Sequence, residues 1–411
     1  MILRARIVLP VTGPAIENGA VEISDGIILS VGKADPNQPS LDLGEVILFP
    51  GFVNAHCHLD YTSMAGKLSP PKAFPDWIKS MLSLKAHYSY TDYAESWMLG
   101  ARQLLQTGTT TVADIEAGRE LLAESLPATP LKVFTFLEMT GVKSGRTGTD
   151  IVRESLNVIE SLPSEFQARA GLSPHSPYST HPDLLAATVA AAKMQKLLIT
   201  SHVAESKPEW DMFVDRSGPL FNWLRTQRHM EDCGGVTPLE QLDRTGILNE
   251  QFLAVHANYL SPGDIDKLAN RSASVVHCPR SHQYFGHAPF PFSELRERGV
   301  NVCLGTDSLA SVRPDHRPVE LSMFEEMQLF STTHPEIHSD EVIRMATSNG
   351  AKALGHASDL GMIAPNASAD LAAIPFNGNL AEAPAAVVNH RGRVTFSMIE
   401  GRCVYPPNTV D

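Results

Sequence analysis

Short apolar runs recur along the middle of the chain, with room for a helix between most of them. Eight of these runs have strand character: residues 49–58, 109–115, 131–139, 168–172, 197–202, 252–256, 274–278 and 300–308. The stretches between them include residues 93–106, 182–196 and 263–270, where apolar side chains fall every three or four positions, as on one face of a helix. The pattern therefore predicts strands that alternate with helices.

This alternation predicts how the strands pair. Strands separated by helices pair in parallel, and eight such units close a (β/α)8 barrel of about 250 residues or somewhat more. We therefore expect an α/β protein with a TIM-like barrel over residues 51–359. The active site of such a barrel lies at the carboxyl ends of its strands. Residues 74–78 are expected to begin a helix over that mouth.

The two ends of the chain have a different character. Residues 2–31 alternate between apolar and polar positions around turns, and short strand-like runs return after Gly361 at 369–374, 386–388, 394–396 and 401–405. We expect residues 1–50 and 360–411 to form one composite domain, a small β-sandwich. A domain built from both termini is expected where the barrel is inserted into it.

Composition narrows the class of protein. The 411 residues are 43% hydrophobic, enough for a large core and two domains. No run reaches the ~18 apolar residues of a membrane span, and no basic and then apolar leader is apparent. Five cysteines without paired spacing favour reduced thiols, and so a cytoplasmic protein. A net charge of -13 argues against general nucleic-acid binding.

The candidate functional residues lie where the strands end. His56 and His58 are two residues apart on a strand, so their imidazoles share one face. An isolated pair of this kind is as well explained by polar residues on a sheet edge. Here His202, His256 and Asp307 also follow strand-like runs, and their side chains would meet the pair at one end of the barrel. Imidazole and carboxylate groups that converge in this way suit a divalent metal.

These residues carry a family resemblance that covers nearly the whole chain. Residues 50–58, His202 to Glu205, His256 and residues 306–308 resemble, in order and spacing, the metal-dependent amidohydrolase superfamily. The tail at residues 360–371 is similar to the family's return into its terminal domain. It departs from the family pattern at Asn366 and Ser368, near a position where glycine is common.

The resemblance implies a role for each residue. His56, His58, His202 and Asp307 would hold one divalent ion, with zinc favoured and iron or manganese as alternatives. A water activated by the metal would attack the substrate, and Asp307 would accept its first proton. Glu205 would protonate a ring nitrogen and later assist loss of ammonia. The alternative for Glu205 is an exposed loop carboxylate. His256 would contact the attacking water or the developing oxyanion.

The end of the fourth strand separates subfamilies. Two-metal relatives commonly place a carboxylated lysine there, whereas this chain has Leu172 to His175 and no lysine. One metal is therefore expected, although Glu138, at the end of the third strand, is a further candidate ligand or substrate contact. A one-metal site with this Glu205 pattern resembles the deaminase and chlorohydrolase branch.

Within that branch, residues 174–179 resemble the adenosine-type deaminases, including those for methylthioadenosine, adenosylhomocysteine and aminodeoxyfutalosine. By this resemblance His175 would reach the ribose side of the substrate. Residues 136–141 and 278–281 are more loosely similar to the aminodeoxyfutalosine enzymes. Arg280 is either a two-pronged partner for a substrate carboxylate or a surface arginine after a turn.

Two further segments bear on the pocket. Trp77, with Phe74, either stacks on a substrate ring or belongs to the core. Residues 59–66 depart from the better-known deaminases and are expected to line the pocket.

The leading hypothesis is a hydrolytic deaminase for an aminopurine nucleoside or a related cyclic amidine. The alternatives are an amidohydrolase or chlorohydrolase acting on a ring substrate, and a barrel that binds without turnover. The expected partner is a small molecule, with no nucleic acid and no membrane. The family resemblance also suggests a homodimer.

Overall fold

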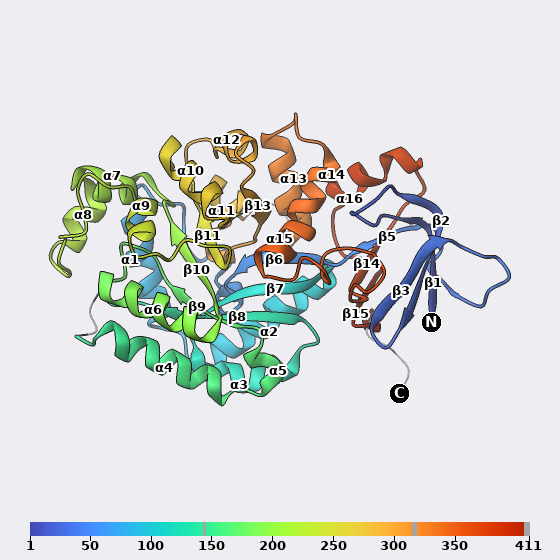
Figure 1. Ribbon diagram of the computed structural model, residues 1–411, viewed down its shortest axis with the longest axis horizontal. Coiled ribbons are helices and arrows are strands. Elements are labelled where there is room, and N and C mark those ends of the chain that lie inside the picture. The colour runs from blue at the N-terminus through green and yellow to red at the C-terminus, as the bar shows by residue number, and fades with distance from the viewer. Residues whose placement is uncertain (143–144, 315–318, 407–411) are drawn as a thin grey trace.

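The computed structural model describes residues 1–142, 145–314 and 319–406, and its centre is the expected barrel (Figure 1). Eight parallel strands are hydrogen-bonded in chain order from β6 to β13. They are β6 (Phe52–Cys57), β7 (Thr109–Glu116), β8 (Lys132–Met139), β9 (Ala170–Pro174), β10 (Leu198–Val203), β11 (Phe252–His256), β12 (Ser274–His277) and β13 (Asn301–Leu304). A parallel bridge between Cys57 and Asp307 joins the last strand to the first.

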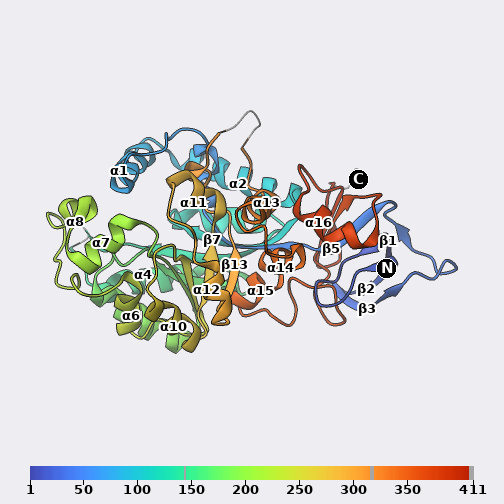
Figure 2. The same ribbon diagram turned by 90° about the horizontal axis from the view of Figure 1, so that it is seen from above.

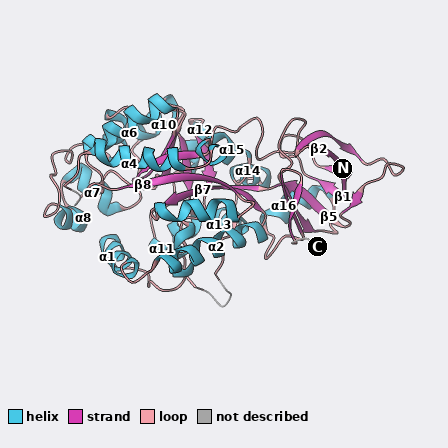
Figure 3. Cartoon of the chain, turned by 90° about the horizontal axis from the view of Figure 1, so that it is seen from below, coloured by secondary structure: helices cyan, strands magenta, loops and turns pink. Residues whose placement is uncertain are grey.

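Helices cover the outside of this sheet (Figure 3). The three helices expected from periodicity are confirmed as α2 (Tyr90–Gln106), α6 (Pro182–Gln195) and α10 (Pro262–Asn270). Further helices between the barrel strands or after the last one include α3 (Leu122–Ser125), α4 (Gly148–Ser161), α5 (Ser164–Gln167), α11 (Pro279–Phe285), α12 (Phe292–Glu297), α13 (Met323–Thr333), α14 (Ser339–Met345) and α15 (Ser348–Ala353). None of the described helices is long and apolar enough to cross a membrane.

The core has two layers because strand side chains alternate. Along β8, Phe134 and Phe136 join a cluster that several other barrel strands supply, which fills the inside of the barrel. Val133 and Leu137 belong to the larger cluster between the strands and the helices. Glu138 has the same parity as the inward residues, so the pattern points its carboxyl into the barrel at the end of the strand.

Strands from both termini form a second, mixed sheet at one end of the molecule (Figure 1). Its order is β16, β15, β14, β5, β1, β2, β3, with β4 also paired to β1. The strands are β1 (Ile2–Val8), β2 (Ile16–Ser24), β3 (Ile27–Lys33), β4 (Leu41–Asp42), β5 (Val46–Pro50), β14 (Leu371–Pro375), β15 (Phe396–Ile399) and β16 (Arg402–Tyr405). Side chains from both termini share one separate core cluster. The expected joining of the two termini is thus confirmed.

One strand-like run is a helix instead. Residues 386–388 belong to α16 (Ala383–Val388), which packs against α13 and α14 of the barrel. The run Ala-Pro-Ala-Ala explains the correction, because proline is well tolerated in the first turn of a helix and alanine has the highest helix propensity.

Two groups of helices lie at the end of the molecule opposite the terminal sheet (Figures 1 and 2). The expected helix over the barrel mouth is α1 (Phe74–Lys85). The second group, α7 (Lys207–Asp215), α8 (Gly218–Leu224) and α9 (Pro238–Arg244), is inserted between β10 and β11. Hydrophobic periodicity did not predict these three helices.

Candidate metal and active site

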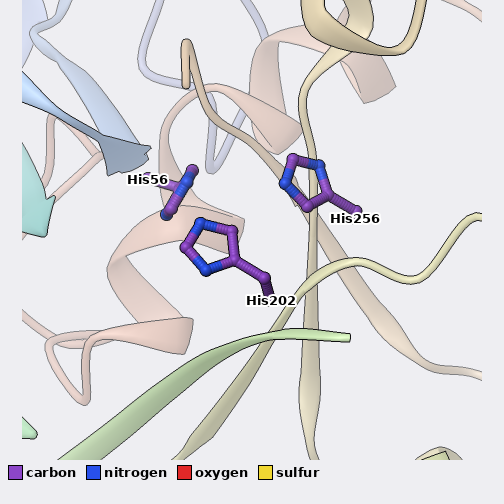
Figure 4. Close-up of side chains that lie close together, drawn as sticks. All are labelled: His56, His202 and His256. Carbon is purple, nitrogen blue, oxygen red and sulfur yellow. The ribbon is translucent and has the colours of Figure 1, made fainter. Parts of the chain in front are cut away.

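Three histidines from three different strands face one another at the carboxyl end of the barrel (Figure 4). His56, His202 and His256 each offer a ring nitrogen, and these atoms all lie within 4.8 Å of one another. His56, His58 and Asp307 form a second such group that shares His56. The strand ends therefore bring together the five residues that the sequence singled out.

Closure of the barrel carries Asp307 to the histidines. The carbonyl oxygen of His56 accepts the backbone N–H groups of Thr306, at 3.0 Å, and Asp307, at 3.1 Å. Asn54 completes the seam: its amide donates to the Thr306 hydroxyl at 2.7 Å and its carbonyl accepts the Thr306 N–H at 3.1 Å. A Cβ on Gly305 would lie 2.9 Å from the His56 carbonyl oxygen, so glycine permits this close approach.

The ring orientations suit metal binding. His202 donates its Nδ1 hydrogen to the carbonyl oxygen of His175 at 2.8 Å, which leaves Nε2 as a lone-pair donor. That Nε2 lies 3.4 Å from the Nε2 of His58, and Asp307 is 3.7 Å from the same His58 nitrogen. Both ring nitrogens of His56 are buried and have no hydrogen-bond partner among the residues that the structure describes. Unpaired buried nitrogens beside a carboxylate fit a divalent cation, because the ion supplies the missing partner.

Glu205 lies beside this cluster. Its carboxylate is 3.7 Å from Nε2 of His256, and both side chains are buried. The backbone adopts left-handed conformations at Ala204, His256, Ala257 and Asp307, with φ between 49° and 72°. Such conformations are uncommon for residues other than glycine and gather at functional sites, where the surrounding structure holds them.

Burial and neighbouring groups shift the pKa values of the titratable side chains in different directions. It lowers the pKa of His58 to about 3 and that of His256 to about 3, so both imidazoles stay neutral. Burial, reinforced by the charge of Asp307, raises the pKa of the Glu205 carboxyl well above its usual value. Burial alone would also raise the pKa of Asp307, but the imidazole of His56 and its neighbours hold it well below the usual range. One carboxyl group is thus favoured as an acid and the other as a base.

A cavity of about 420 Å³ opens next to the cluster. Its polar wall includes Glu138 and His175, whose Oε1 and Nε2 atoms lie 3.9 Å apart. His175 Nδ1 also lies 2.7 Å from the Ser179 hydroxyl. These groups offer hydrogen bonds to a polar part of a ligand.

Another part of the cavity wall is apolar. Helix α1 presents one face to the cavity, with Phe74, Trp77, Ile78, Met81 and Leu82 at helical spacing. Helix α8 adds Trp223 and Leu224. Phe285 of α11 packs on α1, with ring centroids 5.1 Å from Trp77 and 5.3 Å from Phe74. The structure therefore places Trp77 both against other aromatic rings and at the cavity wall.

Arg280, expected either to meet a substrate carboxylate or to lie on the surface, instead pairs with a carboxylate of the same chain. Its Nε lies 2.5 Å from the buried carboxylate of Glu326, and its Nη1 donates to the Glu320 carbonyl at 2.9 Å. It is neither a surface arginine nor among the described residues that line the cavity. The packing of α11 on α13 supplies a carboxylate from the same chain, and the sequence alone does not reveal that pairing.

The sequence alone did not single out three further residues of the site, which are Tyr61, Lys85 and Trp223. Tyr61, in the 59–66 segment that was expected to line the pocket, does so and stacks on His58 with ring centroids 5.3 Å apart. Lys85, at the end of α1, contacts the Tyr61 hydroxyl and lines the cavity. Trp223 comes from the unpredicted insertion. An amphipathic pattern over residues 74–85 was the available signal for Lys85.

Comparisons with known proteins agree with this geometry. Residues 47–404 match the amidohydrolase family. The chain is 31% identical over 387 residues to the 5'-deoxyadenosine deaminase of Methanothermobacter thermautotrophicus, covering 88% of this chain and 83% of that protein.

Two solved structures have the same fold. The aminofutalosine deaminase of Helicobacter pylori in complex with methylthio-coformycin has a TM-score of 0.86 at 22% identity, covering 98% of this chain and 99% of the other. An adenosine deaminase from Xanthomonas campestris with bound zinc has a TM-score of 0.83 at 22% identity, covering 98% and 92%.

Proposed function

This chain belongs to the amidohydrolase family, and from that premise we propose that it is a metal-dependent deaminase of adenosine-type nucleosides. The reaction replaces the exocyclic amino group of the purine by oxygen, consuming water and releasing ammonia. The observation that carries the proposal is the position of Glu205, whose buried carboxyl lies 3.7 Å from His256 beside the metal-ligand cluster.

The proposed metal ligands are His56, His58, His202 and Asp307, and we propose zinc as the ion. Three imidazoles and one carboxylate are donors that zinc accepts readily, and a catalytic site keeps a further position for water. A divalent ion bound there would lower the pKa of a water molecule towards neutrality. The ligand set includes no carboxylated lysine, because β9 ends in Pro174 and is followed by His175, which supports a single ion.

Two carboxyl groups at the site, those of Glu205 and Asp307, carry out the proton transfers. The raised pKa of Glu205 keeps a proton on its carboxyl group, which donates it to the purine ring nitrogen next to the reacting carbon. The ionised carboxylate of Asp307 accepts a proton from the attacking water. Neutral His256 hydrogen-bonds the incoming oxygen. Asp307 then passes that proton to the amino group while the Glu205 carboxylate accepts the proton of the added hydroxyl group; the carbon–nitrogen bond breaks, ammonia leaves, and both carboxyl groups return to their starting states.

The cavity supports a nucleoside with an apolar 5' substituent. Glu138 and His175 are suited to bind the ribose hydroxyl groups. The apolar faces of α1 and α8 lie beyond them, where Trp77 and Trp223 offer ring surfaces to an uncharged group. Two similar proteins support a pocket of this kind, one a 5'-deoxyadenosine deaminase and the other an aminofutalosine deaminase in complex with methylthio-coformycin.

The test is ammonia release from a panel of substrates, with metal content measured on the same sample. The panel contains 5'-deoxyadenosine, methylthioadenosine, adenosylhomocysteine, adenosine, aminopyrimidines, and amino- and chloro-triazines. We expect the highest kcat/KM for the first two and about one metal per chain. Chloride release from a triazine without nucleoside turnover would instead establish the chlorohydrolase alternative. The homodimer and the cytoplasmic location stay predictions.

A further inference from the structure

A buried carboxylate outside the cavity holds the backbone that carries Glu205. Glu209, in the first turn of α7, is completely buried. Its Oε1 accepts the backbone N–H of Ala204 at 3.0 Å, and its Oε2 accepts the backbone N–H of Glu205 at 2.8 Å. Both oxygens of one side chain therefore hold two successive peptide groups at the end of β10.

The opposite side of the same peptides is held by the end of β11. The side-chain amide of Asn258 donates to the carbonyl oxygen of Glu205 at 2.9 Å. The backbone N–H groups of Asn258 and Tyr259 both donate to the carbonyl oxygen of Ala204 at 3.0 Å. The four N–H and C=O groups of residues 204 and 205 thus all have identified partners.

The conformation held in this way is unfavourable for the residue that adopts it. Ala204 has φ of 51°, a left-handed conformation that a residue with a Cβ adopts at an energetic cost. This turn points the chain away from the strand direction just before Glu205. A carboxylate can accept both N–H groups, whereas an amide in its place offers only one acceptor atom.

We propose that Glu209 and Asn258 are positioning residues that clamp the 204–205 peptides and so fix the Glu205 carboxyl for proton transfer. The inference rests on the proposed function for its kinetic part and on geometry alone for the clamp. Neither side chain needs to touch the substrate, because both act through the backbone of Glu205. Partners of this kind behind a reacting group commonly change activity about 10–100-fold when removed.

The main test is Glu209→Gln, with Asp211→Asn as the matched control. Asp211 is on the same helix but pairs with Lys207 at the surface, so its substitution is expected to leave kcat unchanged. For Glu209→Gln we expect kcat to fall about 10–100-fold with KM within about twofold and metal content unchanged. Asn258→Ala is the second variant and is expected to act in the same direction.

Two further readouts separate positioning from a general structural role. In a Glu205→Gln background, Glu209→Gln should cause little further loss, because the group it positions is already absent. Amide hydrogen exchange at Ala204 and Glu205 should quicken in Glu209→Gln, while exchange in the terminal sheet stays as in the wild type.

The possible outcomes are distinct. Wild-type kcat in Glu209→Gln and Asn258→Ala, or an equal loss in the Glu205→Gln background, would overturn the positioning role. A wild-type enzyme that deaminates no nucleoside would refute the proposed function, and hydrogen exchange would then decide the clamp. Unchanged exchange at residues 204 and 205 in Glu209→Gln would overturn the clamp itself.

Discussion

Two buried polar groups at opposite ends of the barrel, Lys132 and His56, differ in their partners. At the amino end, the ammonium group of Lys132, the first residue of β8, lies 2.7 Å from the Asp370 carboxylate and 2.8 Å from the Ser368 hydroxyl. At the carboxyl end, both ring nitrogens of His56 are buried, and no described residue hydrogen-bonds to them. All of these side chains are buried, so the difference lies in the partners and not in the burial.

Left-handed residues gather at Ala204, His256, Ala257 and Asp307, next to or within the candidate site, although Lys196 and Ser272, just before β10 and β12 at the amino end, also adopt this conformation. At the amino end, Asp370 also accepts the Glu400 N–H at 2.9 Å, so one carboxylate joins the barrel to two segments of the terminal sheet. A satisfied network of this kind holds domains together, whereas unpaired donors and strained turns keep a site ready for a ligand.

Removal of the metal should have the largest effect on activity, and this effect should be confined to the carboxyl end of the barrel. Dialysis against a chelator is expected to lower deamination at least about a thousandfold, because the activating charge on the water is lost. One equivalent of zinc should restore it. Circular dichroism serves as the control for the fold. Full activity in a sample shown to be metal-free would contradict the assignment of the histidine cluster.

Glu205→Gln should have the next largest effect on turnover. We expect kcat to fall about 10²–10⁴-fold, since the amide cannot supply the proton, while metal content stays the same. Glu240→Gln, on the neighbouring helix α9, is the matched control and should retain wild-type kcat. A near-normal rate in Glu205→Gln would remove this residue from the proton-transfer role.

Lys132→Met tests the amino end, where the readout is stability. It leaves the buried Asp370 carboxylate without its cation, and the free energy of unfolding is expected to fall by about 3–5 kcal/mol. Arg296→Met breaks an exposed pair with Glu341 and should cost less than about 1 kcal/mol. Denaturant unfolding measures both. A drop in kcat for folded Lys132→Met would show that the two ends are coupled.

Glu138→Gln should have the smallest effect. It tests whether this part of the cavity binds the ribose of the substrate and not the base. Loss of a charged acceptor for a ribose hydroxyl is expected to raise KM about tenfold for nucleosides, roughly 1.4 kcal/mol of binding. The comparison is with a base analogue that lacks the sugar, whose kinetics should not change. An equal change for both substrates would place Glu138 at the metal or at the base.

Much of the fold and of the metal-ligand set follows from the order of residues along the chain. Strand and helix periods are local properties, and the carboxyl ends of parallel strands meet at one edge whatever the details of packing. For that reason the sequence alone places His56, His58, His202, His256 and Asp307 together. The prediction for residues 386–388 was wrong because three apolar residues do not distinguish a strand from a helix.

Packing between distant segments decided the rest. Arg280 forms an ion pair with Glu326, which lies 46 positions away along the chain, and nothing in the local sequence indicates that pair. Glu209 and Asn258 meet the Glu205 backbone only because β10 and β11 are neighbours and α7 folds back on the strand end. The sequence by itself determined which groups reach the mouth of the barrel, through a repeating backbone geometry. Which of them are paired, strained or open to a ligand depends on contacts that form only when the whole chain is packed.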